Sequence, residues 1–113
     1  MKDDWQNYID GAWVDGGAGR VDVMNPGTGE VLATQALADE ADVDRAVAAA
    51  ARVHDSGVLH AMRPVERGRI VQAMGRYLLE HADELAKLLT LEQGKPLWEA
   101  QKEIQGSARY FEY

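Results

Sequence analysis

The chain has 113 residues, with 12 Lys and Arg against 19 Asp and Glu, and a formal net charge of −7. This length allows one domain at most, with a modest core, and the acidic balance argues against a nucleic-acid partner, because phosphates attract basic surfaces. The absence of cysteine excludes a disulfide framework and a thiolate nucleophile within the chain. A polar, acidic first stretch and the lack of any long apolar run predict a cytoplasmic protein with no secretory signal and no membrane contact.

The first third of the sequence is typical of short strands and turns. Apolar residues flank the dipeptide at 10–11, Asp-Gly, which favours a two-residue hairpin turn, so a hairpin is predicted over residues 8–14. Apolar-polar alternation at 21–24 and a β-branched start at 31–37 predict two further strands. The glycines of 16–19 precede an extended stretch, whereas a dinucleotide fingerprint needs a helix there, so a plain loop is predicted.

From Asp39 onward the spacing of apolar residues changes to that of helices, and four helices are predicted. The first follows Asp39 as a capping residue and ends near Gly57, and the second opens at Pro64. Gly75 lies inside the second helix, where glycine costs about 1 kcal/mol relative to alanine. A closely packed neighbour is therefore expected at Gly75. The third helix is predicted over residues 83–93.

Residues 92–96 combine the end of the third helix with the start of the fourth. Gly94 can take the left-handed conformation that closes a helix, and Pro96 fits the first turn of the next one. Lys95 lies where its ammonium group can meet the carbonyls of the outgoing helix, and Glu92 is spaced to reach back into the turn. The sequence therefore predicts a structural turn at these four residues.

The fourth helix has two faces that are both unlike a solvated surface. One apolar stripe contains Leu97, Ala100, Ile104, Ala108 and Phe111, and the opposite side contains Glu99, Lys102, Gly106, Tyr110 and Tyr113. Gly106 in the middle of the helix is destabilising unless something approaches it closely. No stop signal precedes the end of the chain, which predicts a helix that continues in a longer protein.

The three histidines fall in different predicted environments. His54, His60 and His81 have no cysteine partners, and only an occasional carboxylate such as Asp55 is near. We expect solvated or capping histidines and no metal site.

Four motifs in register resemble the N-terminal segment of the NAD(P)-dependent aldehyde dehydrogenase superfamily. They are residues 8–14, Tyr-Ile-Asp-Gly-Ala-Trp-Val; residues 23–33; residues 40–47; and residues 92–96, Glu-Gln-Gly-Lys-Pro. The last motif, taken with its neighbours, is similar to the succinate-semialdehyde dehydrogenase branch. The resemblance implies an α/β fold in which short strands and a hairpin are followed by four helices, without the nucleotide-binding strands.

The resemblance also implies a function for the parent protein, which would be a cytoplasmic, oligomeric oxidoreductase that oxidises an aldehyde to a carboxylate with NAD or NADP. The nucleophilic cysteine, the general base and the oxyanion-holding asparagine of the family lie in later segments, and Glu92 does not match the base. We therefore expect no catalytic and no cofactor-binding residue in this chain, and no activity from the chain alone. Its partners would be the rest of the dehydrogenase or another copy of the chain.

The helix that follows the Gly-Lys-Pro turn borders the substrate-entry tunnel in the family, and its lining positions correspond to Lys102 and Gly106. The alternative is that this side of the helix is a packing face for other domains.

The domain prediction is a strand-and-turn segment over 1–38 and a four-helix segment over 39–113 that packs on an absent dinucleotide-binding domain, together one partial domain. Two other functions stay open: a stand-alone helical binding or assembly module, and a segment of an acylating, CoA-dependent relative.

Overall fold

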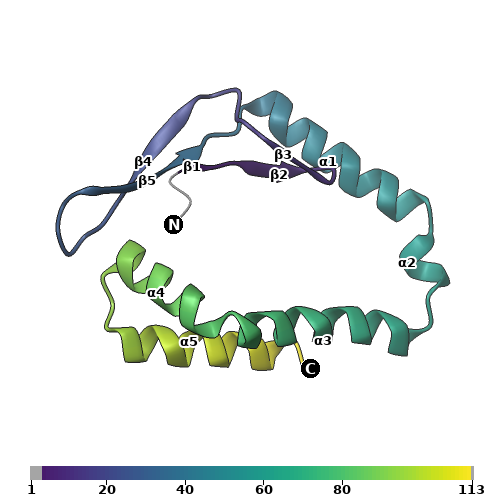
Figure 1. The fold of residues 1–113 in the computed structure, drawn as a ribbon. Coiled ribbons are helices and arrows are strands. Elements are labelled where there is room, and N and C mark those ends of the chain that lie inside the picture. The colour runs from purple at the N-terminus through teal and green to yellow at the C-terminus, as the bar shows by residue number, and fades with distance from the viewer. Residues whose placement is uncertain (1–3, 113) are drawn as a thin grey trace. The chain divides into compact units, whose positions relative to one another are not determined.

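The structure, a computed structural model, describes residues 4–112 (Figure 1). The strands are β1 (Asp4–Trp5), β2 (Asn7–Ile9), β3 (Ala12–Val14), β4 (Arg20–Met24) and β5 (Val31–Ala36). The helices are α1 (Glu40–Asp55), α2 (Val58–Ala61), α3 (Pro64–Glu80), α4 (Ala82–Gln93) and α5 (Leu97–Tyr110). They form two compact units: one runs up to Met24 and resumes over Glu30–Ala61, and the other combines Asn25–Gly29 with the chain from Met62 onward.

The first unit contains two small sheets. Strands β2 and β3 form the predicted antiparallel hairpin, in which Tyr8 lies opposite Trp13. Asp10 and Gly11 have φ angles of 53° and 80°, which is the geometry that a two-residue hairpin turn requires. The second sheet has the order β1-β5-β4, with β1 parallel and β4 antiparallel to β5. Strand β1 was not predicted, because its two residues pair with a segment far along the chain.

Helix α1 begins and ends where the sequence predicts. Asp39 caps its N-terminus in a capping box with Asp42, so each carboxylate accepts a hydrogen bond from the other residue's backbone N–H. The helix ends at Asp55, and Gly57 follows with φ 70°. The four long helices of the prediction are present, and the short helix α2 adds one turn that is too brief to give a periodic signal.

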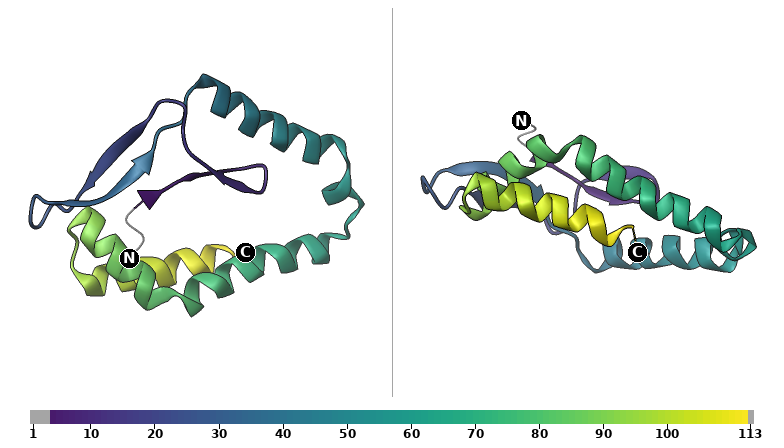
Figure 2. Two further views of the ribbon diagram at one scale, coloured as in Figure 1. Left: turned by 45° about the horizontal axis from the view of Figure 1, so that its top comes forward. Right: turned by 90° about the horizontal axis from the view of Figure 1, so that it is seen from below.

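The second unit consists of helices held together by small residues. Helix α5 packs against α3 and α4, as the views of Figure 2 show. Gly75 of α3 is buried, and a Cβ built on it would lie 2.8 Å from the carbonyl oxygen of Ala108 and 3.1 Å from the Cβ of Phe111. The close neighbour expected at this glycine is therefore confirmed, and it is the backbone of α5.

The buried apolar residues of the described chain are all small. They are Ala33, Ala36, Ala86, Ala100 and Ala108. No large side chain between residues 4 and 112 is fully buried, and many large apolar side chains are exposed. None of the described helices is both long enough and apolar enough to cross a membrane. Many large apolar side chains of the strands and helices are thus left uncovered within the described chain.

The compact units group α1 and α2 with the strands. The division into segments 1–38 and 39–113, and their place in a larger domain, stay predictions.

Candidate functional site

The turn between α4 and α5 has the predicted backbone geometry. Gly94 has φ 73° and ψ 8°, and its N–H donates to the carbonyl of Thr90 at 2.8 Å. This is the left-handed closure that stops a helix at glycine. Pro96 has φ −57° and lies at the N-cap of α5, which begins one residue later at Leu97. Gly94 therefore has the left-handed conformation that was predicted, whereas Pro96 lies one residue before the first helical position predicted for it.

A second loop packs against this turn, within the same unit. A Cβ built on Gly94 would lie 2.9 Å from Cγ of Pro26. The Pro26 loop is itself ordered by Asn25, whose side-chain oxygen accepts from the N–H of Gly27 at 2.9 Å and whose carbonyl accepts from the N–H of Gly29 at 2.8 Å. Two of the family-like motifs therefore meet in space. Sequence reasoning missed this contact, because no local pattern reports which distant segment lies beside a glycine.

The sequence predicts that Lys95 meets the last carbonyls of α4, but its side chain has a different partner in the structure. Its ammonium group forms an ion pair with Glu103, nearly two turns into α5, and its side chain is only 22% exposed. The carbonyl of Thr90 is already met by the N–H of Gly94, so the carboxylate is the stronger partner for the cation. Glu92 is exposed at the end of α4.

Lys102 and Gly106 lie one turn apart on the side of α5 away from the buried Ala100. The ammonium group of Lys102 lies 4.8 Å from the centre of the Trp98 ring, a cation–π contact. A Cβ built on Gly106 would meet no atom of the described chain within 4 Å. No neighbour within the described chain accounts for a glycine at this position, and the glycine leaves open space on the same side of α5 as Lys102.

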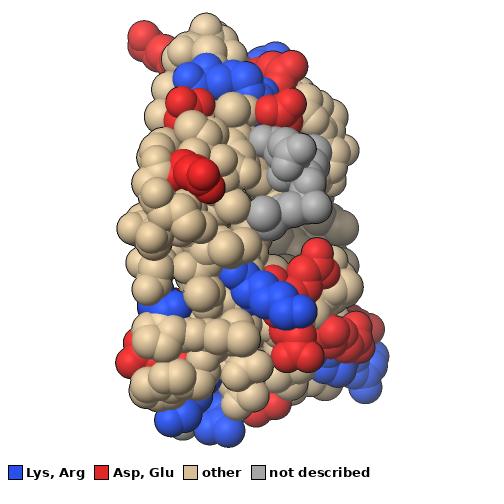
Figure 3. Space-filling view, turned by 60° about the vertical axis from the view of Figure 1, so that its left-hand side comes forward, with Lys and Arg blue, Asp and Glu red and all other residues tan. Residues whose placement is uncertain are grey.

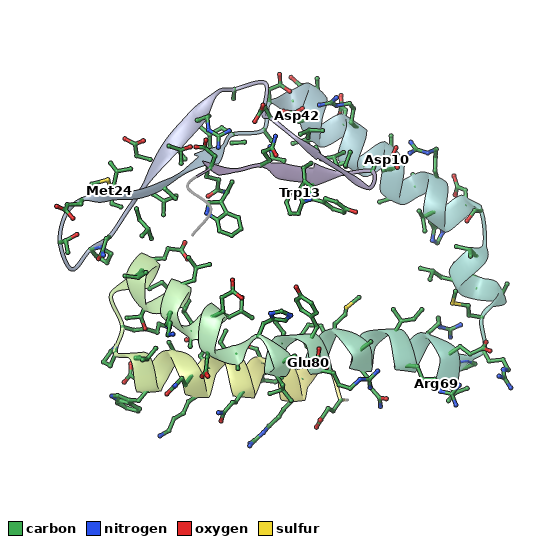
Figure 4. The ribbon with its side chains drawn as sticks, viewed as in Figure 1. Asp10, Trp13, Met24, Asp42, Arg69 and Glu80 are labelled. Atoms are coloured by element: carbon green, nitrogen blue, oxygen red, sulfur yellow. The ribbon has the colours of Figure 1, made fainter. Side chains whose placement is uncertain are left out.

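In the unit that contains the strands, a buried carboxylate, that of Asp42, binds two backbone N–H groups and an arginine. The side chain of Asp42 is 3% exposed and accepts hydrogen bonds from the N–H of Gly17 at 2.8 Å and of Asp39 at 3.1 Å, and it pairs with Arg45. The bonds from Gly17 and Asp39, followed by that from Arg45, lower the pKa of Asp42 to about 2. Figure 4 shows Asp42 at the start of α1.

The glycine loop at 16–19 is confirmed as a connection and does not fit a dinucleotide phosphate. Strand β4 follows it, and the N–H of Gly17 is already taken by a carboxylate. A Cβ on Gly16 would lie 1.8 Å from the carbonyl oxygen of Leu37, so the loop is pressed against the chain that leads into α1. Phosphate binding needs unoccupied N–H groups and no nearby anion.

Several further charges on the described surface form ion pairs with a neighbour of opposite sign. Arg52 of α1 pairs with Asp10 of the hairpin at 2.7 Å, and Arg20 pairs with Asp15 at 3.0 Å. The face drawn in Figure 3 accordingly shows red and blue side chains side by side. Arg63 lowers the pKa of Glu66 through hydrogen bonds from its side chain and its backbone.

The histidines are placed differently from the prediction. The short helix α2 brings His60 to the ring of His54, with centroids 5.1 Å apart, whereas separate environments were expected. The ring centre of His81 lies 4.2 Å from that of Tyr77, with the two planes tilted by 37°, and His81 lies between α3 and α4. Within residues 4–112, no group of three His, Cys, Asp or Glu side chains is placed to hold a metal ion.

Comparison with known proteins identifies the family. Residues 13–113 match the model of the aldehyde dehydrogenase family. The malonate-semialdehyde dehydrogenase 1 of Oceanobacillus iheyensis is 45% identical over 88% of this chain and 20% of its own length, and the glutarate-semialdehyde dehydrogenase of Pseudomonas aeruginosa is 38% identical over 96% and 22%.

Solved structures agree in fold. The NAD-dependent aldehyde dehydrogenase of Sinorhizobium meliloti superimposes with a TM-score of 0.92 at 36% identity, over all of this chain and 23% of that one. Betaine aldehyde dehydrogenase of Staphylococcus aureus in complex with NAD+ gives 0.91 at 34% identity, over 96% and 22%. The chain therefore belongs to the aldehyde dehydrogenase family. It spans about a fifth of the length of the relatives it matches, and its fold is the N-terminal part of theirs.

Proposed function

We propose that this chain is the N-terminal segment of a cytoplasmic, NAD(P)-dependent enzyme that oxidises an aldehyde to a carboxylate. The observation that carries the proposal is the match along residues 13–113, together with a superposition on about a fifth of the NAD-dependent relatives. Similarity to the succinate-semialdehyde branch stays a prediction, and the relatives named above act on other semialdehydes.

The chemistry assigned to the parent cannot come from this chain alone. Aldehyde oxidation of this kind begins with a thiolate that adds to the carbonyl, and the chain contains no cysteine. NAD(P), when bound, accepts the hydride, but the glycine loop at 16–19 offers it no phosphate site. The role proposed for this segment is structural support and a wall of the substrate approach.

We assign that wall to Lys102 and Gly106. Both lie on the side of α5 away from its buried alanines, and the space beside Gly106 is open. An open space next to a cation suits an aldehyde that carries a negative charge elsewhere, because the ammonium group would attract it. The competing assignment of this side as a packing face predicts no effect on substrate selectivity.

A chimera tests the proposal directly. This chain would replace the matching segment of the malonate-semialdehyde dehydrogenase 1 of Oceanobacillus iheyensis, and NADH formation would be measured with and without aldehyde. We expect an active chimera and no activity from the 113-residue chain alone. A chimera that folds and binds NAD but oxidises no aldehyde would contradict the proposal and favour the stand-alone module.

The same chimera tests the wall. Filling the space with Gly106→Leu should lower kcat/KM for the aldehyde about tenfold, and Lys102→Ala should raise KM for an anionic aldehyde more than for a neutral one. Gly68→Ala is the matched control, since the position of its Cβ is also open but lies on α3. If the three variants have the same kcat/KM and the same KM for anionic and neutral aldehydes, this side of α5 is a packing face and not a wall of the substrate approach.

A further inference from the structure

Two histidine rings meet where α1 ends and α2 begins. His54 lies in the last turn of α1 and His60 in α2, and their ring centres are 5.1 Å apart with the ring planes at 79°. Both residues belong to the same compact unit, and both are exposed. The sequence-based prediction of no metal site assumed that the histidines lie in separate environments, and these two do not.

The turn between the two helices holds this pairing in place. Gly57 has φ 70°, and its N–H donates to the carbonyl of His54 at 3.1 Å, which closes α1. The hydroxyl of Ser56 donates to the carbonyl of Val53 at 2.7 Å and accepts from the N–H of Val58 at 3.3 Å. The backbone on both sides of the turn is therefore ordered before any ligand binds, which lowers the entropy cost of binding.

The spacing of the two rings fits a metal ion between them. A tetrahedral zinc ion with Zn–N bonds of about 2.0–2.1 Å holds the centres of two imidazole rings about 5 Å apart, which agrees with the 5.1 Å observed. Each imidazole is free to turn about its own Zn–N bond, so steeply inclined ring planes are compatible with a shared ion. Imidazole nitrogen is also a ligand that zinc prefers.

The surroundings of the two rings favour a cation. The last carbonyl groups of α1 give this end of the helix a partial negative charge. Arg52, two residues before His54, already pairs with Asp10 at 2.7 Å, which offsets its positive charge. Asp55 follows His54 directly, and adjacent residues of a helix do not face each other. Within the described chain no third side chain is placed to complete a metal site, so water would fill the other positions.

We propose that His54 and His60 together bind one zinc ion, whose remaining ligands are water molecules. Two protein ligands make this an open, exchangeable site and not a structural one, because structural zinc sites use four. The proposal concerns residues of this chain alone and does not depend on the activity of the parent.

The first test is a calorimetric titration of the 113-residue chain with zinc chloride. We expect one zinc ion per chain, and an affinity that falls at least about tenfold in His54→Ala and in His60→Ala, because each removes one of two ligands. His81→Ala is the matched control, since His81 belongs to the other unit. No zinc binding by the unmodified chain, or binding that survives the loss of His54 or His60 or that needs His81, would overturn the proposal.

The second test separates a lost ligand from a disturbed fold. Ala50→His, added to His60→Ala, places an imidazole one turn before His54 on α1, where side chains four residues apart are neighbours. The double variant should keep the circular dichroism of the unmodified chain and regain most of its zinc affinity. A double variant that folds normally but binds no better than His60→Ala would contradict a site made of two imidazoles.

The third test concerns the geometry of the bound ion. Cobalt(II) replaces zinc in such sites, and it absorbs visible light strongly when tetrahedral and weakly when octahedral. Titration of the unmodified chain with cobalt chloride should give the strong bands, and His60→Ala should give only weak ones. A weak, octahedral spectrum from the unmodified chain would overturn the tetrahedral arrangement inferred from the ring spacing.

Discussion

The two compact units are held together by different kinds of interaction. In the unit that contains the strands, the most buried charged group, Asp42, accepts hydrogen bonds from two backbone N–H groups and pairs with Arg45. In the helical unit the buried residues are alanines and a glycine that let helices approach closely. The first unit should therefore respond to pH, and the second to side-chain volume.

The largest effect is expected at Gly75. The position of its Cβ is 2.8 Å from a backbone oxygen of α5, so Gly75→Leu should destabilise the helical unit by about 3 kcal/mol, at the upper end of the usual cost of overpacking. Urea unfolding followed by circular dichroism would measure it. Gly68→Ala, in the same helix with open space around it, should instead stabilise by about 0.5–1 kcal/mol. Similar free energies of unfolding for the two variants would contradict the view that side-chain volume at Gly75 limits the packing of α3 against α5.

The next effect is expected at Gly94. Gly94→Val should cost about 1–2 kcal/mol, because a β-branched side chain is strained at φ 73° and would also press on Pro26. Thermal melts would measure the loss. Gly94→Asn, which tolerates left-handed backbone better, should cost less. Coincident melts for wild type and Gly94→Val would show that the turn is not formed in solution.

Acid should distinguish the two units. The pKa of Asp42 is about 2 in the folded chain, below the ordinary aspartate value of about 3.9. The stability that this shift contributes is fully present above the unfolded pKa and is lost as the pH falls towards the folded one. The protection factor of the Gly17 amide, which is its hydrogen exchange rate relative to the intrinsic rate at the same pH, should therefore fall between about pH 4 and pH 2, and Asp42→Asn should abolish that change. An unchanged protection factor at Gly17 would mean that the carboxylate does not hold the loop.

The smallest effect is expected at the ion pair of Arg52 and Asp10. Both side chains are more than half exposed, so Arg52→Gln should change the free energy of unfolding by less than about 1 kcal/mol, and salt should mask the change. Urea unfolding at low and high salt would test this. A larger loss would mean that polar contacts of the first unit are stronger than their exposure indicates.

Much of the fold could be predicted from local sequence. The Asp-Gly pair at 10–11 indicated the hairpin, Asp39 the start of α1 and Gly94 the end of α4, because each acts through its own backbone. The contacts that sequence did not reveal join residues that are distant along the chain or depend on side-chain packing. Examples are Pro26 against Gly94 and the ring contact of His54 with His60.

The candidate wall on α5 was predicted only through family resemblance. The period of the helix placed Lys102 and Gly106 together, but it could not decide whether the glycine faces a neighbour or open space. The structure leaves that position open within residues 4–112.

The contact between Pro26 and Gly94 has a consequence for the order of folding during synthesis. The strands β4 and β5 that flank the Pro26 loop can pair as soon as both have left the ribosome, because they are neighbours in sequence. The loop between them belongs to the helical unit and meets its partner only when Gly94 has been made. Until Gly94 has been made, the Pro26 loop lacks this tertiary contact. The helical unit therefore finishes folding late, although the loop that belongs to it is synthesised early.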